Sequence, residues 1–220
     1  MKLLIANKNY SSWSLRPWLV MRHFGIPFTE ELLLLNGPGW KETMLQRSPT
    51  GRVPVLIDRD LVLAETIAII EYLAESFPHL PIWPADRRDR ALARSAAAEM
   101  HAGFSKLRNA APMNLRASHP GRVPSDAVAS DLHRLEMLWG ELLARSGGPF
   151  LFGDFSAVDA MFAPVAGRIR TYDLPVSDTL SRYVEAIYAL PAFQDWLTEA
   201  RKEPWVVEDD EIDTMQGNTA

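Results

Sequence analysis

Short apolar runs separated by amphipathic stretches fill the first 78 residues of the chain. Residues 2–7 and 28–35 form two such runs and are predicted to be strands. Between them, residues 14–24 carry apolar side chains at helical spacing, and Gly25 follows the last turn. A strand, a helix and a second strand in this order predict a right-handed crossover between parallel strands.

A second group of short elements completes this part of the chain. Residues 40–47 are predicted to be a short helix. The apolar runs 55–57 and 61–63 are separated by an Asp-Arg-Asp turn, and a predicted helix over 66–76 follows them. The resulting order, βαβ-α-ββα, predicts an α/β domain of thioredoxin-like layout with a mixed four-stranded sheet over residues 1–78.

Strand signals almost vanish after a proline-rich linker at 77–84. The remaining pattern is helical, and it predicts an all-α domain over residues 86–203. Its helices are predicted over residues 86–116, 125–145, 177–188 and 191–202.

Two further segments carry local signals. Ser156 precedes Asp159 by three residues just before an apolar stretch, a spacing that predicts a capping box at a helix start. Residues 204–220 form an acidic polar tail, which we expect to be loosely held except around Trp205-Val206-Val207.

Composition narrows the class of protein. Of the 220 residues, 47% are hydrophobic and 23% are charged, values typical of a globular protein with a substantial core. The formal net charge of -5 gives no support to nucleic-acid binding. The chain has no cysteine, which excludes disulfides, thiolate zinc sites and a cysteine nucleophile.

Targeting and metal signals are weak as well. No apolar run reaches the length of a membrane span, and the run at 3–6 is too short for an export signal. A cytoplasmic location is therefore expected. The histidines lack the short spacings that metal sites favour, so no metal is expected.

A serine-rich segment near the first predicted helix is the first candidate site. It lies where the first predicted strand ends, which is where ligands bind in open α/β sheets. Because proline lacks an N–H, Pro17 fits best among the first helical positions, so Ser14 is the predicted N-cap. Ser11 and Ser12 then stand in the preceding loop, and their hydroxyls are candidates for catalysis. A plain serine-rich turn is the alternative.

Two further motifs lie in the second half of the first domain. Val53-Pro54 opens an apolar strand, and Glu65-Thr66 stands at the start of the next predicted helix. The first backbone N–H groups of a helix have no intrahelical acceptor, so this end is a ready site for a carboxylate. An ordinary helix start is the alternative, because Glu and Thr are both common there.

Together these motifs resemble the cytosolic glutathione S-transferase family. Ser11 stands five residues before Arg16, as a serine or cysteine does in the zeta, tau and omega classes, so the chain is similar to a bacterial member of the serine type. The resemblance implies that glutathione is the co-substrate and that the Ser11 hydroxyl stabilises its thiolate, with Ser12 the second candidate and Tyr10 the third. A hydrogen bond to the thiolate lowers the pKa of a thiol that is otherwise near ~8.5.

The same resemblance assigns the other glutathione contacts. It implies a cis peptide bond before Pro54, with the backbone of Val53 pairing to the cysteinyl unit as an added strand would. It implies that Thr66 binds the γ-glutamyl carboxylate and that Glu65 pairs with the γ-glutamyl ammonium. Arg52 is expected at the glycine carboxylate or over the thiol.

The electrophile is expected in a pocket between the two domains. Its candidate lining is Trp13 together with His101, Phe104 and Arg108 on the long helix predicted over 86–116. A core position for Phe104 and a solvated helix face for Arg108 are the alternatives. The resemblance also implies a homodimer, and the expected partners are glutathione and a small electrophile, with neither nucleic acid nor membrane.

Other functions are weighed against this one. The serine segment is also reminiscent of zeta-class enzymes that isomerise maleylacetoacetate, although Trp13 stands where their motif has a cysteine. A glutathione-dependent disulfide reductase is disfavoured because it needs a cysteine. A binding or scaffold protein with the same fold is the alternative outside enzymes. Such a protein need not keep Ser11, Val53-Pro54 and Glu65-Thr66 together, which favours the transferase.

Overall fold

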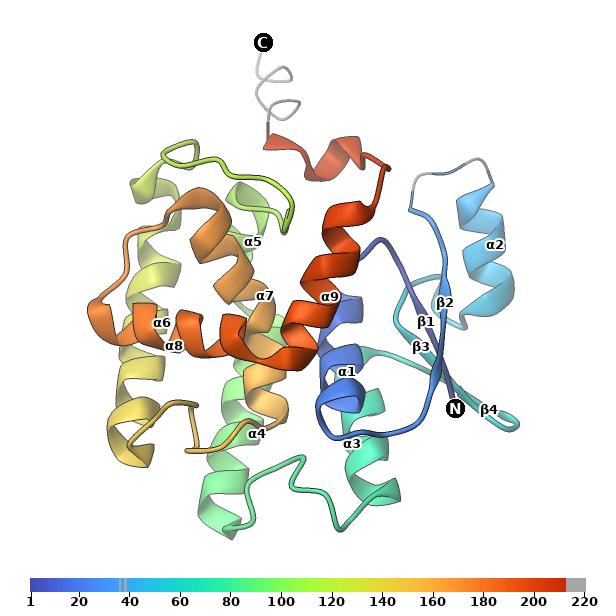
Figure 1. The fold of residues 1–220 in the computed structure, drawn as a ribbon, viewed down its shortest axis with the longest axis horizontal. Coiled ribbons are helices and arrows are strands. Elements are labelled where there is room, and N and C mark those ends of the chain that lie inside the picture. Colours follow the sequence, from blue (N-terminus) through green and yellow to red (C-terminus); the bar gives the residue numbers. More distant parts are fainter. Residues whose placement is uncertain (36, 38, 213–220) are drawn as a thin grey trace.

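The first part of the chain folds around one mixed sheet. The structure, a computed structural model, describes residues 1–35, 37 and 39–212. The strands are β1 (Lys2–Ile5), β2 (Thr29–Leu32), β3 (Val55–Asp58) and β4 (Leu61–Ala64), in the spatial order β2-β1-β3-β4 (Figure 1). The strands β1 and β2 are parallel, whereas β3 runs antiparallel to both β1 and β4. The predicted thioredoxin-like domain with its mixed four-stranded sheet is confirmed.

Helices cover both faces of this sheet. Helices α1 (Ser12–His23) and α3 (Thr66–Ser76) lie on the face toward the rest of the chain, and α2 (Trp40–Arg47) lies on the other (Figure 1). Leu3, Leu4 and Ile5 of β1 are fully buried. Because both faces of the strand are covered, its sequence is a continuous apolar run rather than an alternating one.

The second part of the chain is helical. Its elements are α4 (Arg87–Ala102), α5 (Ser105–Ala110), α6 (Ser125–Ser146), α7 (Ala157–Tyr172), α8 (Asp178–Ala189), α9 (Pro191–Lys202) and the short 3₁₀ helix η1 (Glu208–Asp210). Helix α7 is buried on nearly every side, and it packs against α1 of the first domain as well as α4 and α8. In the described part of the chain, no helix is both long and apolar enough to cross a membrane.

The prediction of a single helix over 86–116 is wrong, because the helix is interrupted at Gly103. A Cβ atom at this position would lie 2.9 Å from the carbonyl oxygen of Glu99, so only glycine fits the exit from α4. Phe104 follows with a φ angle of 58° and begins the separate helix α5. Helical spacing of apolar residues continues across the break, which is why periodicity alone missed it.

The expectation of a loosely held C-terminal tail is wrong for the described part. Val207 is buried as expected, and Ile212 is buried too, whereas Trp205-Val206 is exposed. Glu211 of this segment accepts hydrogen bonds from the Tyr10 hydroxyl and, at 3.0 Å, from Asn114. The remainder of the predicted tail, from residue 213 on, lies outside the described residues.

The predicted capping box at the start of α7 is confirmed, and its acid does more than cap. Asp159 is fully buried and accepts the N–H of Ser156 at 2.9 Å. It also accepts the Leu151 N–H at 3.1 Å and the Tyr183 hydroxyl at 3.0 Å. Burial raises the pKa of the Asp159 carboxyl to about 6. One side chain thus joins α7, α8 and the turn before α7.

We expect Asp159→Ala to lower the free energy of unfolding by about 3 kcal/mol or more, because it leaves several buried donors without an acceptor. Urea denaturation followed by circular dichroism measures the change. Asp154→Ala, which removes an exposed carboxylate from the same turn, serves as the control and is expected to change stability by less than about 0.5 kcal/mol. Equal losses in the two variants would contradict the assignment.

Candidate functional site

Two adjoining cavities lie where the first domain meets the helices. The first has a volume of about 380 Å³ and is lined by Val53, Pro54, Glu65 and Thr66, together with Arg52, Trp13 and His101. The second has a volume of about 410 Å³ and is lined in part by Ser11, Ser12, Arg108, Arg168 and Asp210. Trp13, Arg52 and Val53 line both, so the two cavities share a wall. The structure therefore brings together most of the residues that the sequence singled out.

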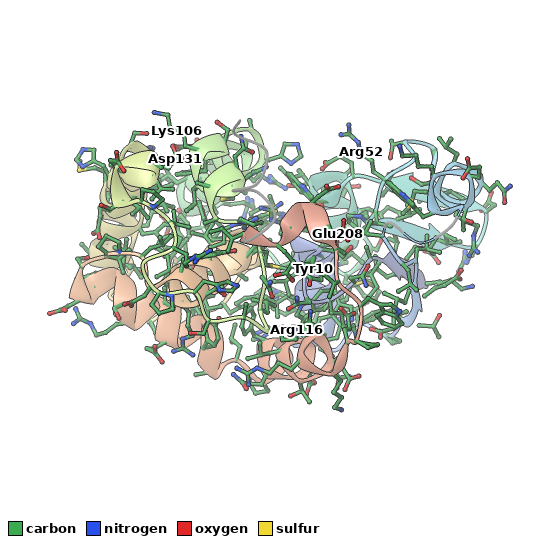
Figure 2. The ribbon with its side chains drawn as sticks, turned by 90° about the horizontal axis from the view of Figure 1, so that it is seen from above. Tyr10, Arg52, Lys106, Arg116, Asp131 and Glu208 are labelled. Atoms are coloured by element: carbon green, nitrogen blue, oxygen red, sulfur yellow. The ribbon has the colours of Figure 1, made fainter. Side chains whose placement is uncertain are left out.

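The wall of the first cavity includes the turn before β3. The Val53-Pro54 peptide bond is cis, as the family resemblance implied, and Pro54 is buried. Val53 stands directly before it at the shared wall of the cavities. Arg52 is exposed, and Figure 2 places it on the first-domain side of the site.

The N-terminus of α3 already holds a carboxylate, which comes from Glu65 itself. Its two oxygens accept the backbone N–H groups of Thr66 at 2.8 Å, Ile67 at 3.0 Å and Ala68 at 3.4 Å. Glu65 has a φ angle of 87°, in a region that L-residues rarely adopt and that often marks functional positions. A ligand carboxylate can reach these N–H groups only if the Glu65 side chain moves away.

Thr66 connects the two halves of the site. Its hydroxyl donates to the carbonyl oxygen of Trp13 at 3.2 Å. Pro17 lies inside α1, four residues after Trp13, and it has no N–H to offer that carbonyl. The Thr66 hydroxyl supplies the missing donor. The start of α3 is thereby attached to the first turn of α1.

The prediction of Ser14 as the N-cap of α1 is wrong, because Ser11 takes this place. The Ser11 hydroxyl accepts the Ser14 N–H at 3.4 Å and donates to the Ser14 hydroxyl oxygen at 2.7 Å. The Ser14 oxygen in turn accepts the Ala6 N–H at 3.1 Å. The helix therefore starts three residues earlier than predicted, with Pro17 inside it. This position of Pro17 is tolerated because the Thr66 hydroxyl donates to the Trp13 carbonyl, which the proline cannot reach with an N–H of its own.

The three candidate hydroxyls have different surroundings. Ser11 is 8% exposed and belongs to the serine network, whereas Ser12 is half-buried as the first residue of α1. The Tyr10 hydroxyl donates to the Glu211 carboxylate and accepts from Arg116 at 3.0 Å. Figure 2 shows Tyr10 between Arg116 and the segment of Glu208, at the junction of the two domains. Burial and Glu211 raise the pKa of Tyr10, so this hydroxyl stays protonated and already has partners.

The residues expected in the electrophile pocket separate into two groups. His101 lies edge-on to Trp13, with ring centroids 5.2 Å apart, and the guanidinium carbon of Arg108 lies 4.8 Å from the Trp13 ring. Phe104 is buried and packs edge-on against Phe162 at 6.2 Å, in the core of the helical domain. Trp13 therefore contacts both His101, which lines the first cavity, and Arg108, which lines the second, whereas Phe104 lines neither.

The structure buries two arginines at this junction. Sequence reasoning used Arg16 only to locate Ser11, and it missed Arg168. Arg16 is 1% exposed, donates from Nε to the Met161 carbonyl at 3.0 Å and lies 4.2 Å from the Trp13 ring. Arg168 of α7 is 4% exposed and donates from Nε to the Ala111 carbonyl at 2.8 Å. Burial lowers the pKa of both guanidinium groups. The available signal was an arginine that stands within an apolar stretch of each helix.

The described residues offer no cluster of three or more His, Asp or Glu side chains that could hold a metal ion. The chemistry of the site is instead that of a helix N-terminus, hydroxyl groups and guanidinium groups around two joined cavities. Such a site suits an anionic ligand with an extended backbone.

Comparisons with known proteins agree with this arrangement. Residues 10–76 match the family model described as the N-terminal domain of glutathione S-transferase. Glutathione S-transferase 1 of Dianthus caryophyllus is 33% identical over 173 residues, which cover 78% of this chain and 70% of that protein. A probable maleylacetoacetate isomerase of Caenorhabditis elegans is 28% identical over 83% of this chain and 86% of that protein.

Two further comparisons cover most of the chain. A stringent starvation protein A homolog of Haemophilus ducreyi is 27% identical over 87% of this chain and 85% of that protein. Among solved structures, a glutathione transferase homolog from Burkholderia GL BGR1, determined with bound glutathione, superposes with a TM-score of 0.71 at 27% identity. That match covers 92% of this chain and 98% of the other.

The link between Thr66 and Trp13 can be tested with a double-mutant cycle. Thr66→Val is expected to lower the free energy of unfolding by about 1–3 kcal/mol, because the Trp13 carbonyl then has no hydrogen-bond donor. Pro17 cannot replace the threonine hydroxyl, since proline has no N–H. In a Pro17→Ala background the helix gains its own N–H donor, so the cost of Thr66→Val should shrink. Thr198→Val, at an exposed position of α9, is the control. An unchanged cost in the Pro17→Ala background would contradict the link.

Proposed function

Because this chain belongs to the glutathione S-transferase family, we propose that it binds glutathione in the first cavity and activates its thiol for attack on a small electrophile in the second. The observation that carries this proposal is the shared wall between the cavities. One side has the cis Val53-Pro54 turn and the N-terminus of α3, and the other has Ser11 and Ser12. A tripeptide extended along Val53 would bring its sulfur to that wall.

Binding of the γ-glutamyl group requires an exchange of carboxylates. The ligand carboxylate would take the N–H groups of α3 that Glu65 now occupies, where the helix dipole favours negative charge. The Glu65 carboxylate would then be free to pair with the ligand ammonium. After the exchange, the ligand carboxylate is bound by the N–H groups of α3 and the Glu65 carboxylate is paired with the ligand ammonium. Neither carboxylate is left without a partner.

Activation of the thiol rests on the serine network. Both hydroxyls can rotate, so Ser14 can donate to Ser11 while Ser11 donates to the glutathione sulfur. The Ala6 N–H that Ser14 accepts would polarise this chain of hydrogen bonds. The thiol proton passes to water, and the thiolate is stabilised. The sulfur then forms a bond to the electrophilic carbon, and the leaving group departs with its electron pair.

We expect Ser11→Ala to lower turnover by about 10- to 100-fold with a modest change in glutathione affinity, because a hydrogen bond to a charged group contributes ~1.5–3 kcal/mol. The pKa of bound thiol, followed by thiolate absorbance, should rise by roughly one to two. Ser11→Gly, which is tolerated at an N-cap, separates this effect from a loss of helix capping. Full activity of Ser11→Ala together with a loss in Ser12→Ala would move the role to Ser12.

The exchange at Glu65 predicts a specific ligand preference. By calorimetry, the wild type should bind glutathione about tenfold or more tightly than glutaryl-Cys-Gly, the same peptide without its amino group. Glu65→Ala should lose this preference and should bind glutaryl-Cys-Gly more tightly than the wild type does, because the competing carboxylate is gone. Glu75→Ala, at an exposed position of the same helix, is the control. Retained preference in Glu65→Ala would rule out the exchange.

Two other functions are separated by the same measurements. The similarity to a probable maleylacetoacetate isomerase and the Ser11-Ser12 pair favour a glutathione-dependent isomerase as the second candidate. Maleylacetoacetate belongs in the substrate panel beside halogenated aromatics and peroxides. The similarity to a stringent starvation protein A homolog raises a scaffold role. A dissociation constant for glutathione far above millimolar would favour that role over catalysis.

A further inference from the structure

His101, at the end of α4, carries a buried nitrogen beside the carboxylate that caps α3. Its Nδ1 atom lies 3.4 Å from Oε1 of Glu65 and makes no hydrogen bond with any described residue. Buried polar groups in proteins are nearly always paired, so this nitrogen needs an explanation. The side chains of His101 and Glu65 are 35% and 45% exposed and both line the first cavity, so both have room to move when a ligand enters.

In the free chain, the Glu65 carboxylate bonds to the N-terminus of α3 and not to His101. Oε1, the oxygen nearest to His101, accepts the Thr66 N–H at 2.8 Å. In the exchange proposed above, a ligand carboxylate takes the N–H groups of α3, and the displaced Glu65 carboxylate needs a cation. The γ-glutamyl ammonium is one such cation. A protonated His101 is a second, because its ring already stands beside the carboxylate.

The other charged groups around His101 are arginines from several elements. Arg108 of α5 donates to the His101 carbonyl at 3.0 Å, and Arg52 lines the same cavity. Arg16 and Arg108 both lie against the ring of Trp13, which His101 contacts edge-on. Among the side chains gathered here, histidine is the one whose charge ordinarily changes between pH 5 and 8. The charge of His101 is therefore what pH varies at this cavity.

We propose that His101 is a positioning residue that decides whether a ligand of the first cavity needs an amino group beside its carboxylate. With neutral His101, the ligand ammonium is required to pair with the displaced Glu65 carboxylate, and the site is specific for the γ-glutamyl group. With protonated His101, the imidazolium takes that place, and an acyl peptide without the amino group binds as well. This inference rests on the proposed function, since it concerns the ligand specificity of the same cavity.

The direction of the pH effect follows from the net charge that each ligand brings. The γ-glutamyl end of glutathione brings one ammonium and one carboxylate, so the local net charge changes little. The glutaryl end of glutaryl-Cys-Gly brings a carboxylate alone. A negative charge beside an imidazole favours its protonated form, so this peptide takes up a proton when it binds. Its affinity should therefore rise as the pH falls, whereas the affinity of glutathione should stay nearly constant.

The test is calorimetry with S-methylglutathione and S-methyl-glutaryl-Cys-Gly, in which the methyl group removes the titration of the thiol. From about pH 8 to about pH 5.5, the wild type should gain about tenfold in affinity for the glutaryl peptide and less than about twofold for S-methylglutathione. His101→Gln should bind the glutaryl peptide weakly at both values of pH. His133→Gln, at an exposed position of α6, is the control and should match the wild type.

Each outcome decides between the two proposals. If both ligands bind and neither affinity depends on pH, the role of His101 is overturned and the proposed function stands. PH dependence that persists in His101→Gln also overturns the role, because another group then carries it. If neither ligand binds, the proposed function fails, and this inference fails with it.

A second measurement decides if His101→Gln does not fold. Proton NMR follows the titration of the five histidines in the wild type. S-methyl-glutaryl-Cys-Gly should raise the titration midpoint of one histidine by about one pH unit, and S-methylglutathione should leave all five nearly unchanged. Midpoints that are the same with both ligands overturn the inference.

Discussion

The Glu203 carboxylate, which accepts the backbone N–H groups of Lys8 and Asn9, is the contact on which the rest of the site depends. These N–H groups belong to a buried polar loop between β1 and the serine segment, where no strand partner is available. The Asn9 side chain then accepts the Arg116 N–H at 2.7 Å and donates to Asn114 at 2.8 Å. One short loop thus fixes the start of α1, the connection after α5 and the segment after α9 against each other.

The polar groups of the site serve the fold before they serve a ligand. Ser11 caps α1, Glu65 caps α3 and Thr66 completes the hydrogen bonding of a helix interrupted by proline. In each case the contact is one that a ligand group could replace with the same kind of interaction. A protein of this design keeps its buried polar atoms paired in the free state, and binding exchanges partners instead of creating new ones. Among the described residues, several buried nitrogens are exceptions and make no hydrogen bond, including those of Arg16, Arg108 and Arg168 but also Trp83 Nε1 and Trp139 Nε1.

Most of the elements could be predicted from the sequence, and the errors have physical causes. Short apolar runs and helical spacing located the four strands and most helices within a few residues, because burial against neighbours sets those periods. The start of α1 was misplaced because a tertiary contact from Thr66 makes an internal Pro17 tolerable. The break at Gly103 was missed because the apolar spacing continues through it. Arg168 went unnoticed, and Arg16 served only to locate Ser11, because the sequence does not show that these two charges are buried where the domains meet.

The contact of Glu203 with Lys8 joins positions 195 residues apart in the chain. A ribosome that has finished the sheet and its helices has therefore made only the scaffold of this site. Domains are synthesised and fold in order from the N-terminus. The backbone N–H groups of Lys8 and Asn9 therefore have no Glu203 carboxylate to bind until the helical domain has been made and has folded. A newly made first domain can therefore have its full secondary structure while the serine segment is not yet fixed in place. The arrangement proposed to activate a thiol is completed only after the segment around Glu203 has been made.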